Sequence, residues 1–598
     1  MTKSREAPTA DRDGADLAAA GERLQQDPGN GTAVAMAVGM ALARLLCALA
    51  AFAAAGIAAA ARAPEPAIFR EDDPLTKEPE TQDASAAVEW NIDLFVDLAI
   101  NLFGQPGERT TGIRAANVNT IDEVPDSSWF TNRILASPLS IEEAARGPLT
   151  GSAPAAGRWT VIASKQSGAA PGFTIEDTAQ NVWFISFDAR GHPEAATGAI
   201  LVANKIFWAL GYWQVENVLT RGWPEQIVIG DAATVRTMSG GRRPMRPDDL
   251  DEVWRRAHRS EDGSFRAVAA RKLPGRALGG FRYHGTRPDD PNDVIPHEHR
   301  RELRALKVFG AWTNLVDMKA GNTLDVLVEE NGRTVVRHYL QDVGSTFGTG
   351  ALAPHEYDEG WEHLYEGGVL LKRLVSLGFF ISPWQTVDYR EHSAIGRFEA
   401  VEFDPAAWKP RVPTAAIRHA QPDDLFWAAR RVAAFSDEMI RALARTGMYS
   451  DPDAERHLAD VLIARRDKIA AAYLTAVAPL VDFELSPEGR LSFENAAVVA
   501  DVAAQPRGGY QVTWLRFDNV TGATEPIGGE RIVAGERATA PGELRGAPDT
   551  LVGVRVVPIA PPHEFPAVQA YFRSNGEGWR LVGLDRHGAL VPQPAQTR

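Results

Sequence analysis

The spacing of apolar residues divides the chain into blocks of different secondary structure. In residues 156–280, short segments such as 181–188 alternate apolar and polar side chains, which predicts strands. In residues 281–480, apolar positions recur every three or four residues, as in 297–315, which predicts amphipathic helices. The alternation returns in residues 481–598. The pattern therefore predicts an α+β fold with a β-rich part, a helical part and a small C-terminal β-domain.

Turn and cap residues refine these elements. A helix within the β-rich part should begin at Pro193 and end at Gly211, because proline suits the first turn of a helix and glycine its end. Residues 236–264 are highly charged, and we interpret them as an exposed insertion between two strands. Asn331 and Gly332 predict the tight turn of a hairpin. The clearest helices of the helical part are expected at 422–446 and 451–477.

The domain organisation follows from chain length and composition. At 598 residues the chain is too long for a single hydrophobic core. An amphipathic helix is expected at 91–103, followed by an arm whose Trp129 should pack onto a domain. The predicted segments are 1–63 (a disordered start with a signal peptide or anchor), 64–155 (a linker and helical arm), 156–280 (the β-rich part), 281–480 (the helical part) and 481–598 (the β-domain).

An apolar segment near the N-terminus bears on location. Residues 33–62 are rich in alanine and leucine and are interrupted by Arg44. They fit a secretory signal peptide if translation starts at Met36 or Met40, since Arg44 then precedes the apolar stretch. A retained membrane anchor and an alanine-rich buried helix are the alternatives. We therefore expect an exported, periplasmic protein or one anchored in the inner membrane, with association to the membrane through this segment.

Charge and cysteine content exclude several classes. The net charge of −15 argues against a nucleic-acid-binding protein, which needs a basic face. Cys47 is the only cysteine, which rules out an intramolecular disulfide and a cysteine-based zinc site. His297 and His299 are two residues apart and cannot share one helical face, unlike the histidines of a zinc-protease helix.

Two short motifs carry the candidate chemistry. Residues 315–324 read LVDMKAGNTL, so that Asn322 follows Asp317 at a distance of five residues. The predicted hairpin comes next, and at its end lies Asp342, ahead of Gly344. Phosphoryl transfer requires a carboxylate that positions and deprotonates the acceptor, together with an asparagine and a second aspartate that hold Mg²⁺. The motifs supply these residue types in that order.

The two motifs, behind a strand-rich part, resemble the protein-kinase-like superfamily. Residues 315–324 resemble its catalytic loop, and Asp342-Val343-Gly344 resembles its metal-binding Asp-Phe-Gly. The resemblance covers roughly residues 156–480 and is closest to atypical bacterial members. It implies a fold of two lobes, a β-rich N-lobe and a helical C-lobe, and a phosphotransferase that uses ATP and Mg²⁺ on an unknown acceptor.

The resemblance also implies roles for individual residues. Asp317 would position or deprotonate the acceptor, and Lys319 would contact the transferred phosphate. Asn322 and Asp342 would hold Mg²⁺. Residues that would bind the nucleotide are Gly168 and Gly172 in a phosphate loop at 164–173, Lys272 in a hinge at 271–275, and Lys165.

Some departures from the family pattern leave two functions open. Ser186 stands where the family has its phosphate-pairing lysine, and we hypothesise that Lys165 supplies this charge from another strand. The acidic residue of the family's helix has no counterpart, since Glu194 lies in the first turn. Leu315 replaces the histidine of the catalytic loop. The alternatives are thus an atypical kinase and a non-catalytic, pseudokinase-like envelope protein that binds a ligand or partner.

Overall fold

The computed structural model describes residues 67–587, except for 137–138, 166–167, 238–240, 391, 543–546 and 561–562. The predicted signal peptide or anchor within 1–63 lies outside the described residues. From Phe69 onward the described residues belong to one compact unit. Among the described residues, no helix is long and apolar enough to cross a membrane.

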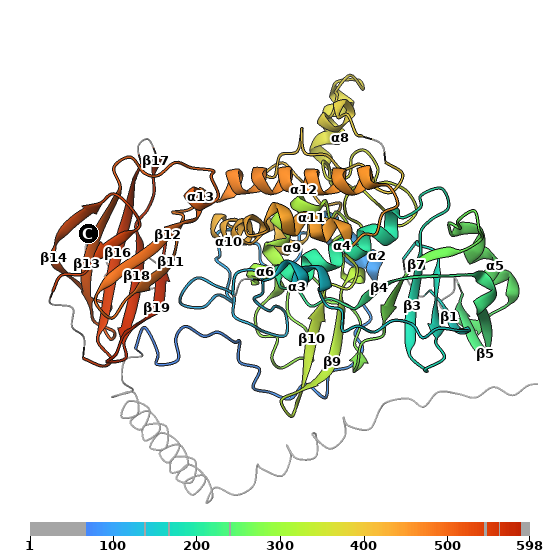
Figure 1. Cartoon of the computed structure of the whole chain (residues 1–598), viewed down its shortest axis with the longest axis horizontal. Helices are drawn as coiled ribbons and strands as arrows, with labels where there is room; N and C mark the ends of the chain where they lie inside the picture. Colours follow the sequence, from blue (N-terminus) through green and yellow to red (C-terminus); the bar gives the residue numbers. More distant parts are fainter. Residues whose placement is uncertain are drawn as a thin grey trace, which may run out of the picture. The chain divides into compact units, whose positions relative to one another are not determined.

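A seven-stranded sheet forms the β-rich part (Figure 1). Its strand order is β4-β7-β3-β2-β1-β5-β6, and all neighbours are antiparallel except β1 and β5. Alternate side chains of β3, among them Ile185 and Phe187, are buried in the core of the sheet, as the sequence pattern predicts. The strands are β1 (Trp159–Ser164), β2 (Gly172–Glu176), β3 (Val182–Phe187), β4 (Asn217–Gly222), β5 (Ile227–Arg236), β6 (Arg242–Pro244) and β7 (Phe265–Arg271).

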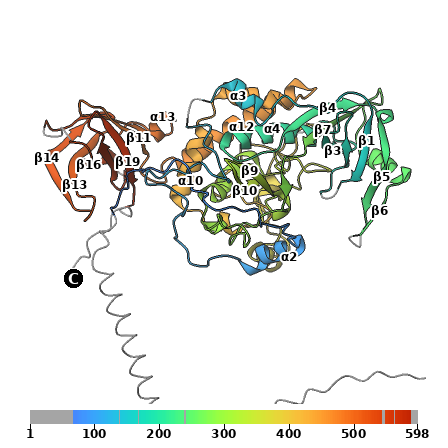
Figure 2. The same ribbon diagram turned by 90° about the horizontal axis from the view of Figure 1, so that it is seen from below.

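Helix α4 (Ala195–Leu210) packs on this sheet. It contacts β3, β4 and β7, and Figures 1 and 2 both show it beside β4 and β7. The helix ends at Gly211, as predicted, where φ is +124°. A side chain at Gly211 would collide with the ring of Phe130 on the arm. The close approach of the arm therefore requires glycine at this position.

The interpretation of 236–264 as an exposed insertion is wrong in part. The segment adds β6 to the sheet and forms α5 (Pro247–Arg256). The Trp254 ring lies 5.2 Å from that of Phe187 and 5.8 Å from that of Phe265, between ring centroids. The apolar stripe of Leu250, Val253 and Trp254 is short and lies among charged residues, so the composition of the whole segment conceals it.

The predicted hairpin is confirmed. Strands β9 (Leu324–Glu330) and β10 (Arg333–Tyr339) pair antiparallel, and β8 (Arg276–Ala277) adds to β9. Asn331 and Gly332 have φ of +50° and +77°, as a two-residue turn with two left-handed positions requires. The hairpin begins directly after Asn322 and ends shortly before Asp342, so it carries both motif residues to one end.

The helical part contains the largest apolar core, and two of its predicted helices are interrupted. The helix expected at 297–315 is divided, and the one expected at 422–446 ends at Ala433, after which Ser436 caps a new helix. The helices of the part are η3 (His297–His299), α6 (Arg301–Arg304), α7 (Leu306–Thr313), η4 (Ala320–Asn322), α8 (Gly367–Val375), η5 (Pro383–Thr386), α9 (Ala415–Arg418), α10 (Pro422–Ala433), α11 (Asp437–Arg445) and α12 (Pro452–Tyr473).

Residues before the sheet form the predicted helical arm. The expected helix at 91–103 is confirmed as α2 (Leu94–Ala99), which continues into the π-helix η1 (Ile100–Gly104). Trp129 is buried and stacks on the ring of His338, with 3.6 Å between centroids, so its predicted packing role is confirmed. The remaining helices outside the helical part are α3 (Ile141–Arg146), η2 (Pro224–Gln226) and α13 (Ala496–Val499).

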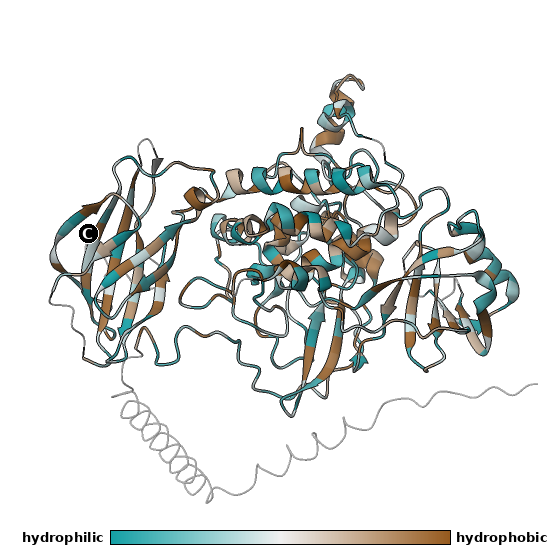
Figure 3. Cartoon of the chain, in the orientation of Figure 1, coloured by the Kyte–Doolittle hydropathy of each residue, from teal (hydrophilic) through white to brown (hydrophobic). Residues whose placement is uncertain are grey.

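One apolar segment lies outside these cores. None of the residues of α8 is buried, and Figure 3 shows brown, apolar residues along this helix. Leu374 and Val375 are 70% and 74% exposed, and Leu377 and Phe379 just beyond the helix are 85% and 87% exposed. These side chains therefore add nothing to the packing of the helical part.

The C-terminal residues form two further sheets. A three-stranded sheet has the order β11-β12-β15, and a larger sheet runs β14-β13-β16-β18-β19, with β17 beside β16. Side chains from both sheets, such as Leu491 and Val554, share one apolar core. The strands are β11 (Leu480–Leu485), β12 (Arg490–Asn495), β13 (Tyr510–Phe517), β14 (Thr524–Val533), β15 (Arg537–Thr539), β16 (Leu551–Ala560), β17 (His563–Glu564), β18 (Val568–Ser574) and β19 (Trp579–Asp585). The predicted mixture of helices and sheets is confirmed.

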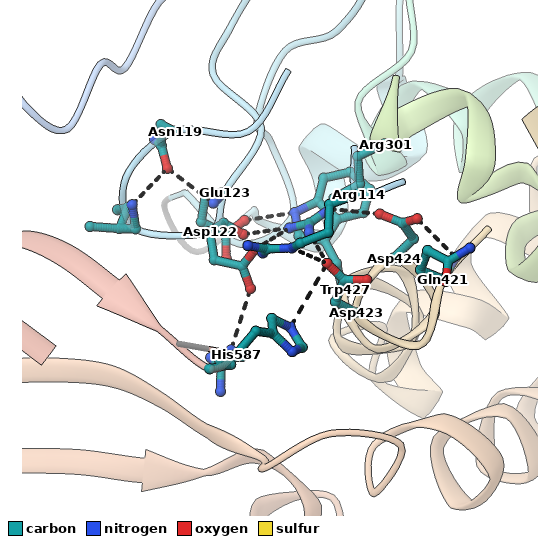
Figure 4. A network of polar contacts seen from close by, with 12 residues as sticks. Arg114, Asn119, Asp122, Glu123, Arg301, Gln421, Asp423, Asp424, Trp427 and His587 are labelled. Atoms are coloured by element: carbon teal, nitrogen blue, oxygen red, sulfur yellow. Dashed lines mark hydrogen bonds and ion pairs between the residues drawn. The ribbon is translucent and has the colours of Figure 1, made fainter. Parts of the chain in front are cut away.

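A buried cluster of charges joins the arm, the helical part and the chain that follows β19 (Figure 4). Its centre is Arg301, whose guanidinium lies 2.8 Å from Asp122, 2.9 Å from Asp423 and 3.0 Å from Asp424. Arg304 binds the other oxygen of Asp424 at 3.0 Å. Arg301, Arg304 and Asp424 are completely buried. Burial of this many charges is tolerated only because each finds opposite charge and hydrogen bonds.

Replacement of Arg301 should destabilise the protein strongly. Arg301→Ala removes one cation from each of three buried carboxylates, which should cost about 3–5 kcal/mol of unfolding free energy, as for other broken buried ion pairs. The measurement is the shift of the urea unfolding midpoint. Arg441→Ala is the control, because Arg441 and its partner Asp460 are 45% and 61% exposed; its cost should be below about 1 kcal/mol. Equal small shifts would contradict a central role for the cluster.

Candidate active site

The loop after α7 is folded on itself around Asn322. Helix α7 ends at Asn314, whose left-handed φ of +56° turns the chain into the loop. The side-chain amide of Asn322 donates to the carbonyl oxygen of Asp317 at 2.7 Å, and its backbone N–H donates to that of Lys319 at 3.0 Å. Lys319 Nζ lies 2.7 Å from an Asp317 carboxylate oxygen. The three predicted residues of this loop are therefore brought together.

Asp342 lies directly beside this loop. Its backbone N–H donates to the carbonyl oxygen of Asn322 at 3.0 Å, and its Oδ1 accepts the N–H of Gly344 at the same distance. A side chain at Gly344 would meet Ile200 on α4 at 2.7 Å, so glycine permits close packing there. The motif Asp342-Val343-Gly344 thus lies between the loop of Asn322 and α4.

The site has oxygen donors of the kind that Mg²⁺ binds. Within the described part of the chain, Oδ1 of Asn322 and Oδ2 of Asp342 accept no hydrogen bond. Carboxylate and amide oxygens are the ligands that this hard cation prefers. No group of three or more histidine, cysteine, aspartate and glutamate residues arranged for a metal ion occurs among the described residues. Asn322 and Asp342 fit a site that is completed by phosphate oxygens and water.

Lys165 lies beside Ser186, as required if it supplies the charge of the lysine that Ser186 replaces. Lys165 follows β1, and its Nζ donates to Ser186 Oγ on β3 at 3.1 Å. Burial lowers the pKa of Lys165, whereas the negative charge of Asp342 raises it. Lys165 from the sheet, Ser186 from the third strand and Asp342 from the end of the hairpin are thus close enough to interact.

Arg256 is a second cation at this place, and the sequence motifs do not indicate it. Its positive charge contributes to the lowered pKa of Lys165, and its Nη2 donates to the carbonyl oxygen of Ala169 at 2.5 Å. Arg256 is the last residue of α5, in the segment that we interpret from sequence as an exposed insertion. Arg256 reaches the site because α5 packs on the sheet, which the composition of the segment does not predict.

The two glycines of the predicted phosphate loop have different roles. Gly168 has φ of +81°, a left-handed conformation that favours glycine, in the loop between β1 and β2. Gly172 starts β2, and a side chain there would lie 2.1 Å from the carbonyl oxygen of Ile185. Glycine at 172 is therefore required by strand packing, whatever binds nearby.

Lys272 is not joined to the other candidate residues. Its backbone N–H donates to the carbonyl oxygen of Val182 and extends the pairing of β3 with β7. Its side chain is exposed, and no hydrogen bond or ion pair links it to another described residue. A role of Lys272 in a hinge beside a nucleotide stays a prediction.

Helix α4 offers no carboxylate to Lys165. Its residues Ala195–Leu210 include no aspartate or glutamate. Glu194, which precedes it, accepts hydrogen bonds from Ser450 and lies 3.6 Å from Arg266. The expected absence of the family's helix glutamate is consistent with this geometry, and the hydroxyl of Ser186 holds Lys165 instead.

Three titratable side chains surround Asp317, and no sequence motif marks them. Burial lowers the pKa of His355 to about 3, so this histidine is neutral, and it hydrogen-bonds Ser345 Oγ at 2.9 Å. Burial raises the pKa of Glu359 to about 7, with further increases from the carboxylates of Asp358 and Asp317, against the effect of Arg411. Burial and the charge of Asp317 raise the pKa of Tyr283.

The histidines His297 and His299 are structural. His297 Nε2 lies 2.8 Å from Asp293, and His299 Nδ1 lies 2.8 Å from an Arg304 nitrogen. Both rings are buried. These hydrogen bonds account for the burial of both rings.

Comparisons with known proteins add little to this geometry. No family model matches the chain, and no curated protein matches it. Two solved structures of the Golgi casein kinase, one with Mn/ADP bound, match at 9% and 10% identity. The matches cover 67% and 66% of this chain and 96% and 95% of those chains, each with a TM-score of 0.25. At this TM-score the likeness carries no weight.

The raised pKa of Glu359 predicts a pH-dependent stability. With a folded pKa of about 7 against an ordinary 4.5, the folded chain binds the proton more tightly than the unfolded chain. This contribution is complete below pH 4.5 and is lost as the pH rises through 7. Between pH 5 and 8 the wild type should therefore lose roughly 1–3 kcal/mol relative to Glu359→Gln. Urea unfolding at several pH values measures this difference. Glu225→Gln, at an exposed residue away from Glu359, should keep the wild-type slope; equal slopes for wild type and Glu359→Gln would contradict the prediction.

Proposed function

We propose that the protein is a phosphotransferase of kinase-like architecture that uses ATP with Mg²⁺. In this proposal the seven-stranded sheet with α4 is the N-lobe and the helical part is the C-lobe. The observation that carries it is the meeting of Lys165, held by Ser186, with Asp342, which is bonded to the loop of Asp317 and Asn322. Separate segments thus contribute a cation, two metal-type ligands and a carboxylate to one place, as phosphoryl transfer requires.

The residues divide into a nucleotide side and an acceptor side. Lys165 and Arg256 would neutralise the phosphates, and Asn322 and Asp342 would hold Mg²⁺, which offsets the charge on the phosphate oxygens. Asp317 would accept the proton of the acceptor hydroxyl as its oxygen bonds to the terminal phosphorus. The bond from that phosphorus to the bridging oxygen breaks, and ADP leaves. Lys319, paired with Asp317, would contact the transferred group.

A non-catalytic protein that binds a ligand or partner is the second candidate. The absence of a carboxylate on α4 favours it, because among the described residues no carboxylate forms an ion pair that fixes Lys165 in an active position. Nucleotide binding is compatible with both functions, so it does not distinguish them. Only the enzyme requires Asp317. If residues 33–62 export or anchor the chain, either function would belong to the cell envelope.

Nucleotide binding should depend on Mg²⁺, Lys165 and Asp342. At a nucleotide concentration one hundred times the Kd, binding should add about 2.7 kcal/mol of stability, seen as a rise of Tm with ATP and Mg²⁺ together. Lys165→Met and Asp342→Asn should remove most of this rise. Lys77→Met is the matched control, since Lys77 is 53% exposed and pairs with Glu330. If Lys272 belongs to a hinge beside the nucleotide, Lys272→Met should also reduce the rise of Tm. A rise that survives in both site variants would contradict the proposed site.

Turnover should depend on Asp317 while binding does not. Asp317→Asn removes the proton acceptor and should lower phosphate release from ATP, or autophosphorylation, by roughly 100-fold or more. The Tm rise with ATP and Mg²⁺ should remain. Asp388→Asn, at a residue outside the site, should retain the wild-type rate. Binding without any turnover in the wild type would rule out the enzyme and leave the ligand-binding function.

A further inference from the structure

Helix α8 presents its apolar side to solvent. Leu370 and Leu374, and likewise Leu371 and Val375, are four residues apart, so they form one stripe of the helix. The apolar stripe of a surface helix normally packs on the core, but this one is exposed. Exposed apolar side chains continue beyond the helix with Leu377, Phe379 and Ile381. We call residues 370–381 the apolar segment.

The polar side of α8 is bonded to the body of the protein. Arg373 Nη2 lies 2.9 Å from Glu362 Oε1 and donates to Ser382 Oγ at 3.1 Å. The indole N–H of Trp384 donates to the same carboxylate at 2.7 Å. Glu362 and Ser382 are both buried. Because these bonds hold the polar side of α8 inward, its apolar side faces outward.

The charge beside the apolar segment is positive. Residues 367–387 contain no aspartate or glutamate, although the chain as a whole has a net charge of −15. Lys372 is exposed, and its Nζ lies 5.6 Å from the centre of the Phe380 ring. No carboxylate of the described residues forms an ion pair with Lys372. Its charge is therefore available to an anion that lies against an apolar surface.

The exposed surface projects from the protein and continues onto the arm. In Figure 1, α8 extends outward from the rest of the helical part. The exposed ring of Tyr365, just before α8, lies 4.9 Å from the exposed ring of Phe103 on η1, between centroids. A peptide helix binds in an apolar groove, whereas a projecting apolar surface with a neighbouring cation suits the interface of a lipid bilayer.

We propose that the apolar segment inserts into the surface of a bilayer that contains anionic lipid. Its leucine, valine, isoleucine and phenylalanine side chains reach the boundary of the acyl chains, and Lys372 pairs with a lipid phosphate. The negative charge of the rest of the chain opposes binding elsewhere, so contact is confined to this surface. The proposal depends neither on phosphotransfer nor on the predicted association through residues 33–62.

A fluorescent label on the segment tests insertion in the full chain. Cys47→Ser removes the only native cysteine, and Leu374→Cys then carries a nitrobenzoxadiazole label, whose emission rises and shifts to the blue on leaving water. Vesicles with equal parts of phosphatidylethanolamine and phosphatidylglycerol should produce both changes in a saturable way. The same label at Ser260→Cys, an exposed residue beyond α5, should not respond. Binding through residues 33–62 alone would leave both labels in water and would overturn the proposal.

Substitutions within the segment test which side chains hold the lipid. Phe379→Glu with Ile381→Glu, in the chain labelled at 374, should raise the lipid concentration for half response by roughly tenfold or more. Val520→Glu with Ile532→Glu is the matched control, because these apolar residues are also exposed but lie on the C-terminal sheet. The control should respond like the parent chain, and neither pair should lower Tm. Equal effects of the two pairs would contradict the proposal.

Charge and self-association distinguish the bilayer from other occupants. Lys372→Glu should weaken the response to vesicles with phosphatidylglycerol, and vesicles of phosphatidylcholine alone should bind the parent chain more weakly. An equal response to both kinds of vesicle would overturn the role of Lys372. Sedimentation velocity without lipid should show no dimer that Phe379→Glu with Ile381→Glu dissociates. Such a dimer would mean that a second copy of the chain covers the apolar segment, and it would also overturn the proposal.

Discussion

The ion cluster around Arg301 is the constraint on which the middle of the structure depends. A guanidinium and its carboxylates can be removed from water only if all partners are present, because any one left unpaired carries a large desolvation cost. The members of the cluster come from the arm (Asp122), from α6 (Arg301 and Arg304) and from α10 (Asp423 and Asp424). Arg586, just after β19, lies 3.4 Å from Asp122 and donates to the carbonyl oxygen of Ala478. Distant segments are thereby fixed to one another at one place.

The cluster also fixes the position of the candidate active site, because α6, which carries Arg301, leads into α7 and the loop of Asp317. Helix α7 continues the chain from α6, and its end at Asn314 sets the start of the loop that contains Asp317. The sheet is held to the helical part by Arg266 on β7, which donates to Thr197 at the start of α4 and to the carbonyl oxygens of Gly447 and Met448. Lys165, which belongs to the sheet, therefore has a defined position relative to Asp342, which belongs to the hairpin and its loop.

The sequence predicted what depends on local spacing and missed what depends on long-range contacts. The hairpin followed from Asn331 and Gly332, and it determines by itself that Asn322 and Asp342 meet. The hypothesis that Lys165 replaces the lysine missing at Ser186 depended only on the pairing of β2 with its neighbours β1 and β3. Arg256 could not be predicted, because its position follows from the packing of Trp254. Buried arginines at 300, 301 and 304 also contradict the usual rule that charged positions of a helix face water.

The distribution of charge at the site determines the direction in which a substrate can bind. Lys165 lies near both Asp342 and Arg256, so this side holds two cations and one anion. Around Asp317 the neighbours are the carboxylates of Asp358 and Glu359, with Arg411 as their cation. In the proposed phosphotransferase, a polyphosphate would therefore be attracted to the sheet side, and its terminal phosphate would point toward Asp317. Since Ser186 is neutral, the charge of Lys165 is not cancelled by a partner on β3. In the proposed phosphotransferase, this charge would be available to a phosphate oxygen.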